Sequence, residues 1–361
     1  MTESMARQSG VPSRMPSLAI GPGNVAGQGY QWSEAVSREF GISSWSFAGT
    51  RANVRRIDGA PHFRIPHHRV RPRAVRDLWI RGLLSSRTHV LVESLEPLVG
   101  DPRFSLVTDE LPFLESLGLS VGAVFHGSDV RSPARHMDRL SQSYFRLWDH
   151  SEREGLEERA AKRRAAADAM GLPCFVSTPD LLLDLPRANW LPLVIDSGAW
   201  ATDRRLLENR RPVVMHIPSR RNPPIKGSDY IEPVLADLAR QGLIDYRAPA
   251  GVVPHREMMG LVKGADIVVE QILVGSYGVA AVEAMAAGCV VIGYVGDQVR
   301  QNMPENPPIV DTTPEAFLDT MMQVIREPEH YLALAASGPG YVERIHSGSM
   351  SALSLGGFLG I

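Results

Sequence analysis

The sequence predicts an α/β protein built from two doubly wound units in series. Short apolar segments that fit strands alternate with helix-like segments, as is typical of parallel sheets covered by helices on both faces. The 361 residues suffice for two domains, and a composition of 44% hydrophobic and 22% charged residues is ordinary for globular proteins. A stretch rich in Pro, Trp and Gly, residues 186–200, separates the two runs and predicts the domain linker.

The first unit is expected at residues 17–190, after a polar tail at residues 1–16. Its expected strands are short and apolar, and each ends at a polar or glycine-containing turn. They lie at residues 18–20, 43–49, 88–94, 119–125 and 173–177. Its expected helices lie at residues 28–40, 109–118, 132–152 and 154–171, with a short one after residue 178.

The second unit is expected at residues 191–335, and the same alternation resumes there. Its expected strands lie at residues 213–219, 244–249, 265–271, 289–296 and 307–313. Its expected helices lie at residues 228–242, 254–264, 277–288 and 314–328. The last segment, residues 336–361, is expected to be helical.

Composition excludes several classes of protein. The net charge of −2 gives no general attraction to nucleic acid, so no nucleic-acid partner is expected. The two cysteines, Cys174 and Cys289, have no metal-binding spacing and cannot form a disulfide framework. No apolar run approaches about 18 residues, and the polar N-terminus lacks the apolar core of a signal peptide. We therefore expect a cytoplasmic protein.

Positive charge is concentrated in one segment, residues 51–87. It holds ten arginines against two acidic residues. One interpretation is an ordinary solvated surface. The other is a patch that meets an anion, either an acidic membrane at the inner face or a phosphorylated acceptor.

A glycine-rich turn follows the first expected strand. Gly21-Pro22-Gly23-Asn24-Val25-Ala26 fits G-x-G-x-x-A, the fingerprint of a strand that turns into a helix around a dinucleotide. A nicotinamide site should also have an acid about 20 residues later, at the end of the second strand. That strand candidate ends at Gly49-Thr50-Arg51, without an acid, although Arg51 would suit a 2′-phosphate.

The strongest chemical signal is one carboxylate in an otherwise apolar helix. Glu283 lies in the expected helix between Tyr277 and Gly288, and a buried carboxylate requires a partner. Side chains on a helix lean toward its N-terminus, where the free N–H groups of Tyr277, Gly278 and Val279 face outward. A pyrophosphate at that end and a sugar diol on the carboxylate would satisfy these groups. The alternative is a glutamate paired with neighbouring backbone or arginine.

A cluster of cations follows the first strand of the second unit. Arg220, Arg221 and Lys226 lie on a loop at the carboxyl end of that strand, where open α/β sheets bind ligands. Arginine forks and a lysine point charge suit a diphosphate. Solvated surface charges are the simpler alternative.

His126 ends a strand of the first unit and would face the second unit across a cleft. A core or surface histidine is the alternative. The chain contains no Asp-x-Asp to hold a metal on a diphosphate, so the cations and the helix dipole would neutralise the leaving group. We expect neither a metal nor a cofactor.

These motifs together resemble those of GT-B fold glycosyltransferases, most closely glycosyltransferase family 4. "YGVAAVEAMAAGCVVIGY", residues 277–294, is similar to the glutamate signature of that family, and "PSRRNPPIKGSD", residues 218–229, resembles its phosphate loop. "FHGSDVR" resembles its first-domain His-Gly turn, and "GPGNVAGQGYQW" resembles its N-terminal glycine loop. The resemblance covers nearly the whole chain.

The resemblance implies two Rossmann-like domains facing a cleft, with the C-terminal helix crossing back onto the first domain. It implies a UDP- or GDP-sugar donor on the C-terminal domain and an acceptor on the N-terminal domain. Transfer would retain configuration and need no metal.

Site residues carry over by position. Glu283 would bind the ribose, and Lys226 with Arg220 or Arg221 would bind the diphosphate. The amides of Ser276, Tyr277 and Gly278 would cap the phosphates. His126 would lie near the donor sugar or the reaction centre.

One position departs from the family pattern. The family often shows Glu-x7-Glu, whose first glutamate touches the donor sugar, and Gly275 stands at that position here. Glu270 or Gln271 is the candidate replacement, and we take Glu270 as a catalytic candidate beside His126.

The glycine turn is accordingly interpreted as a loop that lines the acceptor cleft through Gly23, Asn24, Ala26, Gly27 and Gln28. A purely structural turn is the alternative. Other functions also remain open: a nucleotide-sugar 2-epimerase, a catalytically silent nucleotide-binding protein, or an NAD(P) oxidoreductase. The base, the sugar, the acceptor and the oligomeric state are not predicted.

Overall fold

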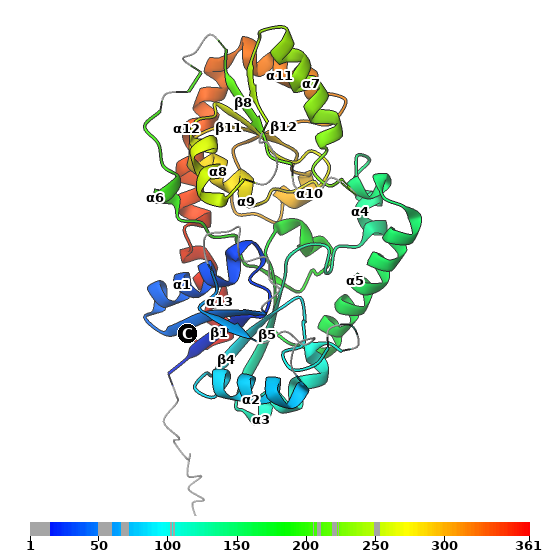
Figure 1. Ribbon diagram of the computed structural model, residues 1–361, viewed down its shortest axis with the longest axis vertical. Coiled ribbons are helices and arrows are strands. Elements are labelled where there is room, and N and C mark those ends of the chain that lie inside the picture. Colours follow the sequence, from blue (N-terminus) through cyan, green and yellow to red (C-terminus); the bar gives the residue numbers. More distant parts are fainter. Residues whose placement is uncertain are drawn as a thin grey trace, which may run out of the picture.

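The computed structural model describes residues 15–361 apart from 50–59, 66–71, 102, 104, 205, 208–210, 219–221, 223, 249–252 and the side chain of Arg256. It has two lobes, each built around one parallel sheet (Figure 1). The carboxyl ends of the strands carry the loops considered below as the candidate site.

The N-terminal lobe contains a seven-stranded sheet in the order β3-β2-β1-β4-β5-β6-β7, parallel throughout. Its central strands are buried on both faces, which explains their continuous apolar sequences. The strands are β1 (Ser17–Gly21), β2 (Ser43–Gly49), β3 (Phe63–Ile65), β4 (His89–Glu93), β5 (Ser120–Phe125), β6 (Cys174–Val176) and β7 (Asn189–Trp190). β3 lies inside the arginine-rich segment and β7 inside the expected linker, and neither strand was predicted.

Helices cover both faces of this sheet. The α-helices are α1 (Gln28–Phe40), α2 (Arg73–Leu84), α3 (Leu111–Ser116), α4 (Pro133–Arg139) and α5 (His150–Met170). The 3-10 helices are η1 (Val25–Gly27), η2 (Val107–Glu110), η3 (Tyr144–Leu147) and η4 (Pro179–Leu183). The helix expected at residues 132–152 is therefore wrong as a single element, because α4 ends at Arg139 and the backbone of Leu140 is extended.

The C-terminal lobe contains a five-stranded parallel sheet in the order β12-β11-β10-β8-β9. Its strands are β8 (Val213–His216), β9 (Asp245–Arg247), β10 (Ile267–Val269), β11 (Val290–Gly293) and β12 (Ile309–Asp311). Its helices are α6 (Ser197–Trp200), α7 (Ser228–Arg240), α8 (His255–Lys263), α9 (Val279–Ala286), α10 (Asp297–Arg300), α11 (Phe317–Arg326) and α12 (Pro328–His346).

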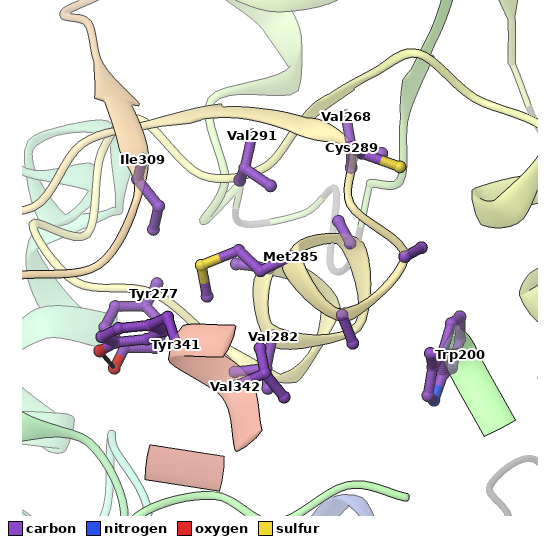
Figure 2. Close-up of a cluster of buried hydrophobic side chains, with 14 of the residues drawn as sticks. Trp200, Val268, Tyr277, Val282, Met285, Cys289, Val291, Ile309, Tyr341 and Val342 are labelled. Carbon is purple, nitrogen blue, oxygen red and sulfur yellow. Dashed lines mark hydrogen bonds between the residues drawn. The ribbon is translucent and has the colours of Figure 1, made fainter. Parts of the chain in front are cut away.

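Helix α9 is enclosed between the sheet and α12, as its apolar sequence predicts. Figure 2 shows Met285 facing Val291 and Ile309 of the sheet, while Val282 meets Val342 of α12. Just before α9 begins, the hydroxyl of Tyr277 lies 2.8 Å from that of Tyr341 on α12. These contacts fix the start of α9 against the rest of the lobe.

Within the described residues, three segments connect the lobes. The first, residues 191–196, leads from the N-terminal to the C-terminal lobe. The second follows α12 and leads back, so that α13 (Ser349–Leu359) packs on α1 and completes the N-terminal core. This is the expected crossing of the C-terminal helix.

The third connection is an arm, residues 133–149, that leaves the N-terminal lobe and reaches the other lobe. Its Tyr144, Phe145 and Trp148 belong to the same buried cluster as Val214 and Ile231 of the C-terminal lobe. Figure 1 shows α4 at the end of α5 nearest the upper lobe. The sequence did not reveal this arm.

Candidate functional site

The loops at the carboxyl ends of both sheets form the region where the lobes meet. From the N-terminal lobe come the glycine loop after β1, Glu93 at the end of β4 and His126 after β5. From the C-terminal lobe come Glu270 after β10 and the loop that leads into α9. Ligands bind at this edge in open α/β sheets.

The start of α9 presents backbone donors. The amides of Ser276, Tyr277 and Gly278 donate to no acceptor within the described part of the chain. The Tyr277 side chain points away from them, into the core, where its hydroxyl also lies 3.1 Å from Nε2 of His346. Free amides at the positive end of a helix dipole can bind an anion.

Glu283 opens into a cavity lined by both lobes, which we call the Glu283 cavity. This cavity has a volume of about 230 Å³, and its other lining residues include Ala26 and Gln28 of the glycine loop. Glu283 Oε1 lies 2.8 Å from Nε2 of His255, on α8. His255 is thus the partner that a buried carboxylate requires, and the sequence did not identify it.

Lys226 is paired within the protein. Its Nζ lies 2.8 Å from Oε1 of Glu270, and both side chains are largely buried. Glu270 Oε2 is buried and has no hydrogen bond in the described structure. The two residues predicted separately, one for the diphosphate and one for catalysis, therefore form one ion pair. Arg220 and Arg221 lie outside the described residues.

The glycine loop binds a carboxylate of the protein itself. The amides of Gly23 and Asn24 donate to Glu93 Oε2 at 2.7 and 2.6 Å, and that of Val25 donates to Oε1 at 3.1 Å. Asn24, Ala26 and Gly27 all have positive φ, which turns successive amides inward. The anion-binding equipment of the turn is therefore already occupied.

Gln28 has a structural role besides lining the Glu283 cavity. Its side-chain amide exchanges two hydrogen bonds with the backbone of Val194, at 3.1 and 2.7 Å. The start of α1 is thereby tied to the segment that joins the lobes.

His126 completes the Glu93 arrangement. Its Nε2 lies 3.1 Å from Glu93 Oε1, and its ring stacks on Trp32 at 5.7 Å between centroids. Burial by itself would raise the pKa of Glu93, but His126 and the loop amides outweigh it and lower that pKa. Burial would likewise lower the pKa of His126, but Glu93 and then Asp129 raise it. The structure therefore favours a buried imidazolium–carboxylate pair.

Glu93 was missed in the sequence. It is only 1% exposed, although it ends the apolar strand β4 with a charge at the functional edge of the sheet. A lone carboxylate at the carboxyl end of a buried strand is the signal that could have identified it.

A second cavity is also lined by residues of both lobes, and we call it the Gly275 cavity. It has a volume of about 220 Å³ and is lined by Gly275 and Asp297 from the C-terminal lobe and by Leu140 and Asp180 from the N-terminal lobe, among others. Residues 276–278, with their free amides, thus lie in the chain between this cavity and the Glu283 cavity.

Residues of the arginine-rich segment, 51–87, differ in whether they are buried or exposed. Arg76 is buried and donates to the carbonyl oxygens of Leu98, Val99 and Gly100, so it belongs to the fold and not to a surface patch. Nearby, α2 exposes Leu78 and Trp79, at 70% and 52%. Five of the arginines, at positions 51, 55, 56, 69 and 71, lie outside the described residues.

No helix within the described residues is both long and apolar enough to cross a membrane. No cluster of three or more His, Cys, Asp or Glu side chains there is arranged to hold a metal ion.

Comparison with known proteins gives matches in structure only. No family model matches the sequence, and no curated protein matches it. HepE of Anabaena in complex with UDP has a TM-score of 0.59 at 10% identity, over 96% of this chain and 100% of that chain. Sucrose-phosphate synthase from Thermosynechococcus elongatus has a TM-score of 0.56 at 14% identity, over 96% and 98%.

A third solved structure belongs to a different enzyme class. A putative UDP-N-acetylglucosamine 2-epimerase from Listeria monocytogenes has a TM-score of 0.53 at 11% identity, over 97% of this chain and 98% of that chain. All these matches span both lobes, and the two parallel sheets, the facing loops and the returning α13 agree with the same architecture. The chain therefore has the GT-B fold found in glycosyltransferases.

Proposed function

We propose that this protein is a glycosyltransferase that moves a sugar from a nucleoside-diphosphate sugar of the UDP or GDP type to an acceptor. One observation carries the proposal: the free amides of residues 276–278 directly precede Val279, which together with Glu283 lines a cavity formed by both lobes. Glu283 would accept hydrogen bonds from the ribose hydroxyls. The amides of Ser276, Tyr277 and Gly278 would bind the diphosphate.

The leaving diphosphate requires positive charge as the glycosidic bond breaks. Lys226 is the described residue that we propose for this charge, and its ion pair with Glu270 keeps the ammonium at the carboxyl edge of the sheet. We propose that the diphosphate, when it binds, partly replaces Glu270 as the partner of the Lys226 ammonium. Transfer without metal and with retention of configuration follows from the resemblance in sequence and is part of the proposal.

The test is a thermal-shift and calorimetry series with UDP, GDP, ADP, TDP, NAD and NADP, with and without Mg²⁺. We expect one nucleoside diphosphate to stabilise the protein in the absence of metal, because a ligand that binds only the folded state raises the melting temperature. Glu283→Gln should weaken that binding by about tenfold, or about 1.4 kcal/mol. Glu257→Gln, an exposed position on α8, is the matched control.

Stabilisation by NAD or NADP alone would overturn the proposal. The geometry argues against that outcome, because Glu93 holds the glycine-loop amides that a dinucleotide phosphate would need. Equal affinity of Glu283→Gln and the native protein for the nucleotide would refute the assigned ribose site.

A nucleotide-sugar 2-epimerase is the second candidate, favoured by the likeness to the putative Listeria epimerase. The two functions differ in their need for an acceptor. An epimerase converts the donor sugar alone, whereas a transferase releases nucleotide only as it transfers or hydrolyses the sugar. NMR of the donor after incubation without acceptor distinguishes them, and a silent nucleotide-binding protein would leave the donor unchanged in every assay.

For the acceptor, we propose an anionic or membrane-borne molecule reached through the surface of α2. Leu78 and Trp79 project from this helix, which lies within the arginine-rich segment, a combination suited to the interface of an acidic bilayer. Vesicles with anionic lipid should co-sediment the protein at low salt better than neutral vesicles. Leu78→Ser with Trp79→Ser should reduce this binding, and Leu318→Ser, an exposed position on α11, should not. Equal binding to both kinds of vesicle would refute the membrane route.

A further inference from the structure

The arm contacts both loops that carry the proposed diphosphate ligands. Nε1 of Trp148 donates to the carbonyl oxygen of Pro224 at 3.0 Å, in the loop that contains Lys226. The amide of Tyr144 donates to the carbonyl oxygen of Leu273 at 3.3 Å, in the loop that leads into α9. A segment that follows β5 and precedes α5 of the N-terminal lobe therefore supports the ligand-binding edge of the other lobe.

His136 makes the most specific contact of the arm. Its Nε2 lies 2.9 Å from the carbonyl oxygen of Val274, and its Nδ1 lies 2.6 Å from Oγ of Ser143. Burial, and then the charge of Arg131, lowers the pKa of His136 to about 4, so the ring is neutral at pH 7. Because a carbonyl oxygen only accepts, Nε2 carries the proton and Nδ1 accepts from the serine hydroxyl. The ring is thereby held in one tautomer and one orientation.

The loop before α9 has every carbonyl oxygen of residues 273–276 hydrogen-bonded. Two of these oxygens accept from the arm, the third from the Gly296 amide at 3.1 Å and the fourth from Nε2 of Gln271 at 2.7 Å. Because a trans peptide is planar, a held carbonyl group directs the next N–H group the opposite way. The arm thus fixes the two peptides that precede the free amides of residues 276–278.

The arm also packs on the turn at Gly275. This residue has φ +74°, and a Cβ atom there would lie 3.2 Å from Cδ2 of Leu140, at the end of α4. The arm is in turn anchored in its own lobe, where Nη2 of Arg139 lies 3.3 Å from Oδ2 of Asp184. Movement of the arm toward the loop would press on this turn, and movement away would break the hydrogen bond of His136.

We propose that the arm holds the loop before α9 in the conformation that binds the diphosphate, and that His136 is the positioning residue that fixes Val274 in it. This inference rests on the proposed function, because the diphosphate is there assigned to the amides of residues 276–278. His136 acts through Val274, so affinity for a nucleotide on the C-terminal lobe depends on a side chain of the N-terminal lobe.

Two substitutions of His136 separate its hydrogen bond from its bulk. The amide nitrogen of glutamine can take the place of Nε2, whereas that of asparagine, one methylene shorter, reaches only the place of Nδ1. His136→Asn therefore leaves Val274 without its donor, and a loop that populates other conformations binds more weakly by the fraction that is competent. In calorimetry with UDP and GDP, we expect about tenfold weaker binding by His136→Asn and less than about a threefold change in His136→Gln.

Two control variants exclude a merely structural effect. His150→Asn makes the same change at an exposed histidine, at the start of α5. Val36→Ala removes packing from a buried cluster on α1 that contains no residue of the arm, so it lowers stability without touching the loop. Both should bind nucleotide as the native protein does. If His136 only stabilises the fold, His136→Asn will also bind with native affinity, and that result would overturn the inference.

Hydrogen exchange in the ligand-free protein tests the loop without any nucleotide. The amide of Ile272 donates to the carbonyl oxygen of Lys226 at 3.0 Å, so its exchange reports how firmly the two loops are held. We expect exchange at Ile272 to be about tenfold faster in His136→Asn and close to native in His136→Gln and in both controls. Native exchange in His136→Asn, or equal changes in the two variants of His136, would contradict the positioning role.

The two readouts distinguish failure of this inference from failure of the proposed function. If the native protein binds no nucleotide, the proposed function and the role in diphosphate binding are refuted, and hydrogen exchange decides whether the arm holds the loop. If His136→Asn does not fold, Trp148→Phe decides the question, because it keeps an aromatic ring but removes the N–H group donated to Pro224. That variant should bind nucleotide about threefold more weakly, and native affinity would overturn the inference.

Discussion

Glu93→Gln tests whether one internal carboxylate organises the N-terminal side of the site. Glu93 is 1% exposed and accepts from the amides of Gly23, Asn24 and Val25 while it faces His126. Glutamine keeps the shape of the side chain but removes the charge. It also replaces one acceptor oxygen by an NH₂ group that would face backbone N–H donors.

The expected loss of stability follows from these contacts. A hydrogen bond to a charged group contributes about 1.5–3 kcal/mol, and breaking a buried ion pair from one side costs about 3–5 kcal/mol. Because glutamine preserves packing and some hydrogen bonding, we expect the free energy of unfolding to fall by about 3 kcal/mol. For a lobe of this size, that corresponds to a decrease in melting temperature of about 6–12 °C.

The difference between native protein and variant should depend on pH. The lowered pKa of Glu93 means that its contribution is present above its unfolded pKa of about 4.3 and is lost as pH falls through the folded pKa. The raised pKa of His126 means that its contribution is complete below about pH 6.5 and is lost as pH rises through the folded pKa. The difference should therefore be largest between about pH 5 and 6.5.

Urea unfolding at several pH values, with NMR titration of His126, measures both quantities. Glu96→Gln is the matched control, since Glu96 lies just after β4 and pairs with Arg163 at a partly exposed site. A loss below about 0.5 kcal/mol, within the range of ordinary surface substitutions, would contradict the organising role of Glu93. An unchanged pKa of His126 in the variant would contradict the ion pair.

Three further predictions concern the C-terminal lobe. Gly275→Ala should lower the free energy of unfolding by about 1–2 kcal/mol in chemical denaturation, because of its positive φ and the contact with Leu140, and Leu140→Ala should relieve part of the loss. Tyr277→Phe should cost about 1 kcal/mol, because the hydroxyl of Tyr341 loses a buried partner; no loss would contradict the role of this contact in anchoring α9. EDTA should leave the melting shift caused by the nucleoside diphosphate unchanged, and a shift restored only by Mg²⁺ would contradict metal-independent binding.

Much of the fold could be predicted from local patterns. The alternation of apolar strands and helices predicted two parallel α/β units, and the structure contains them. Helix α1 has the predicted bounds, and the apolar sequence of α9 predicted its burial. The short strands β3 and β7 were missed, because segments of two or three residues carry too little periodicity to predict a strand.

The candidate site was predicted in part. The prediction that Glu283 needs a partner was correct, because burial makes an unpaired carboxylate costly. In the structure, this partner is His255. The pairing of Lys226 with Glu270 was not predicted, although both residues had been selected. Side chains 44 positions apart in the chain meet only because neighbouring strands bring the two loops together.

The sequence by itself determined the two α/β units, the apolar helix with its single carboxylate and the clustering of charge. These are properties of neighbouring residues, and backbone geometry and burial translate them directly into structure. Only the tertiary structure decided what the glycine loop binds, because Glu93 lies about 70 positions away from the amides that it accepts. It also decided that the arm of the N-terminal lobe contacts Gly275 of the C-terminal lobe. Such contacts depend on packing between distant segments, and they produce no periodic pattern in the sequence from which they could be predicted.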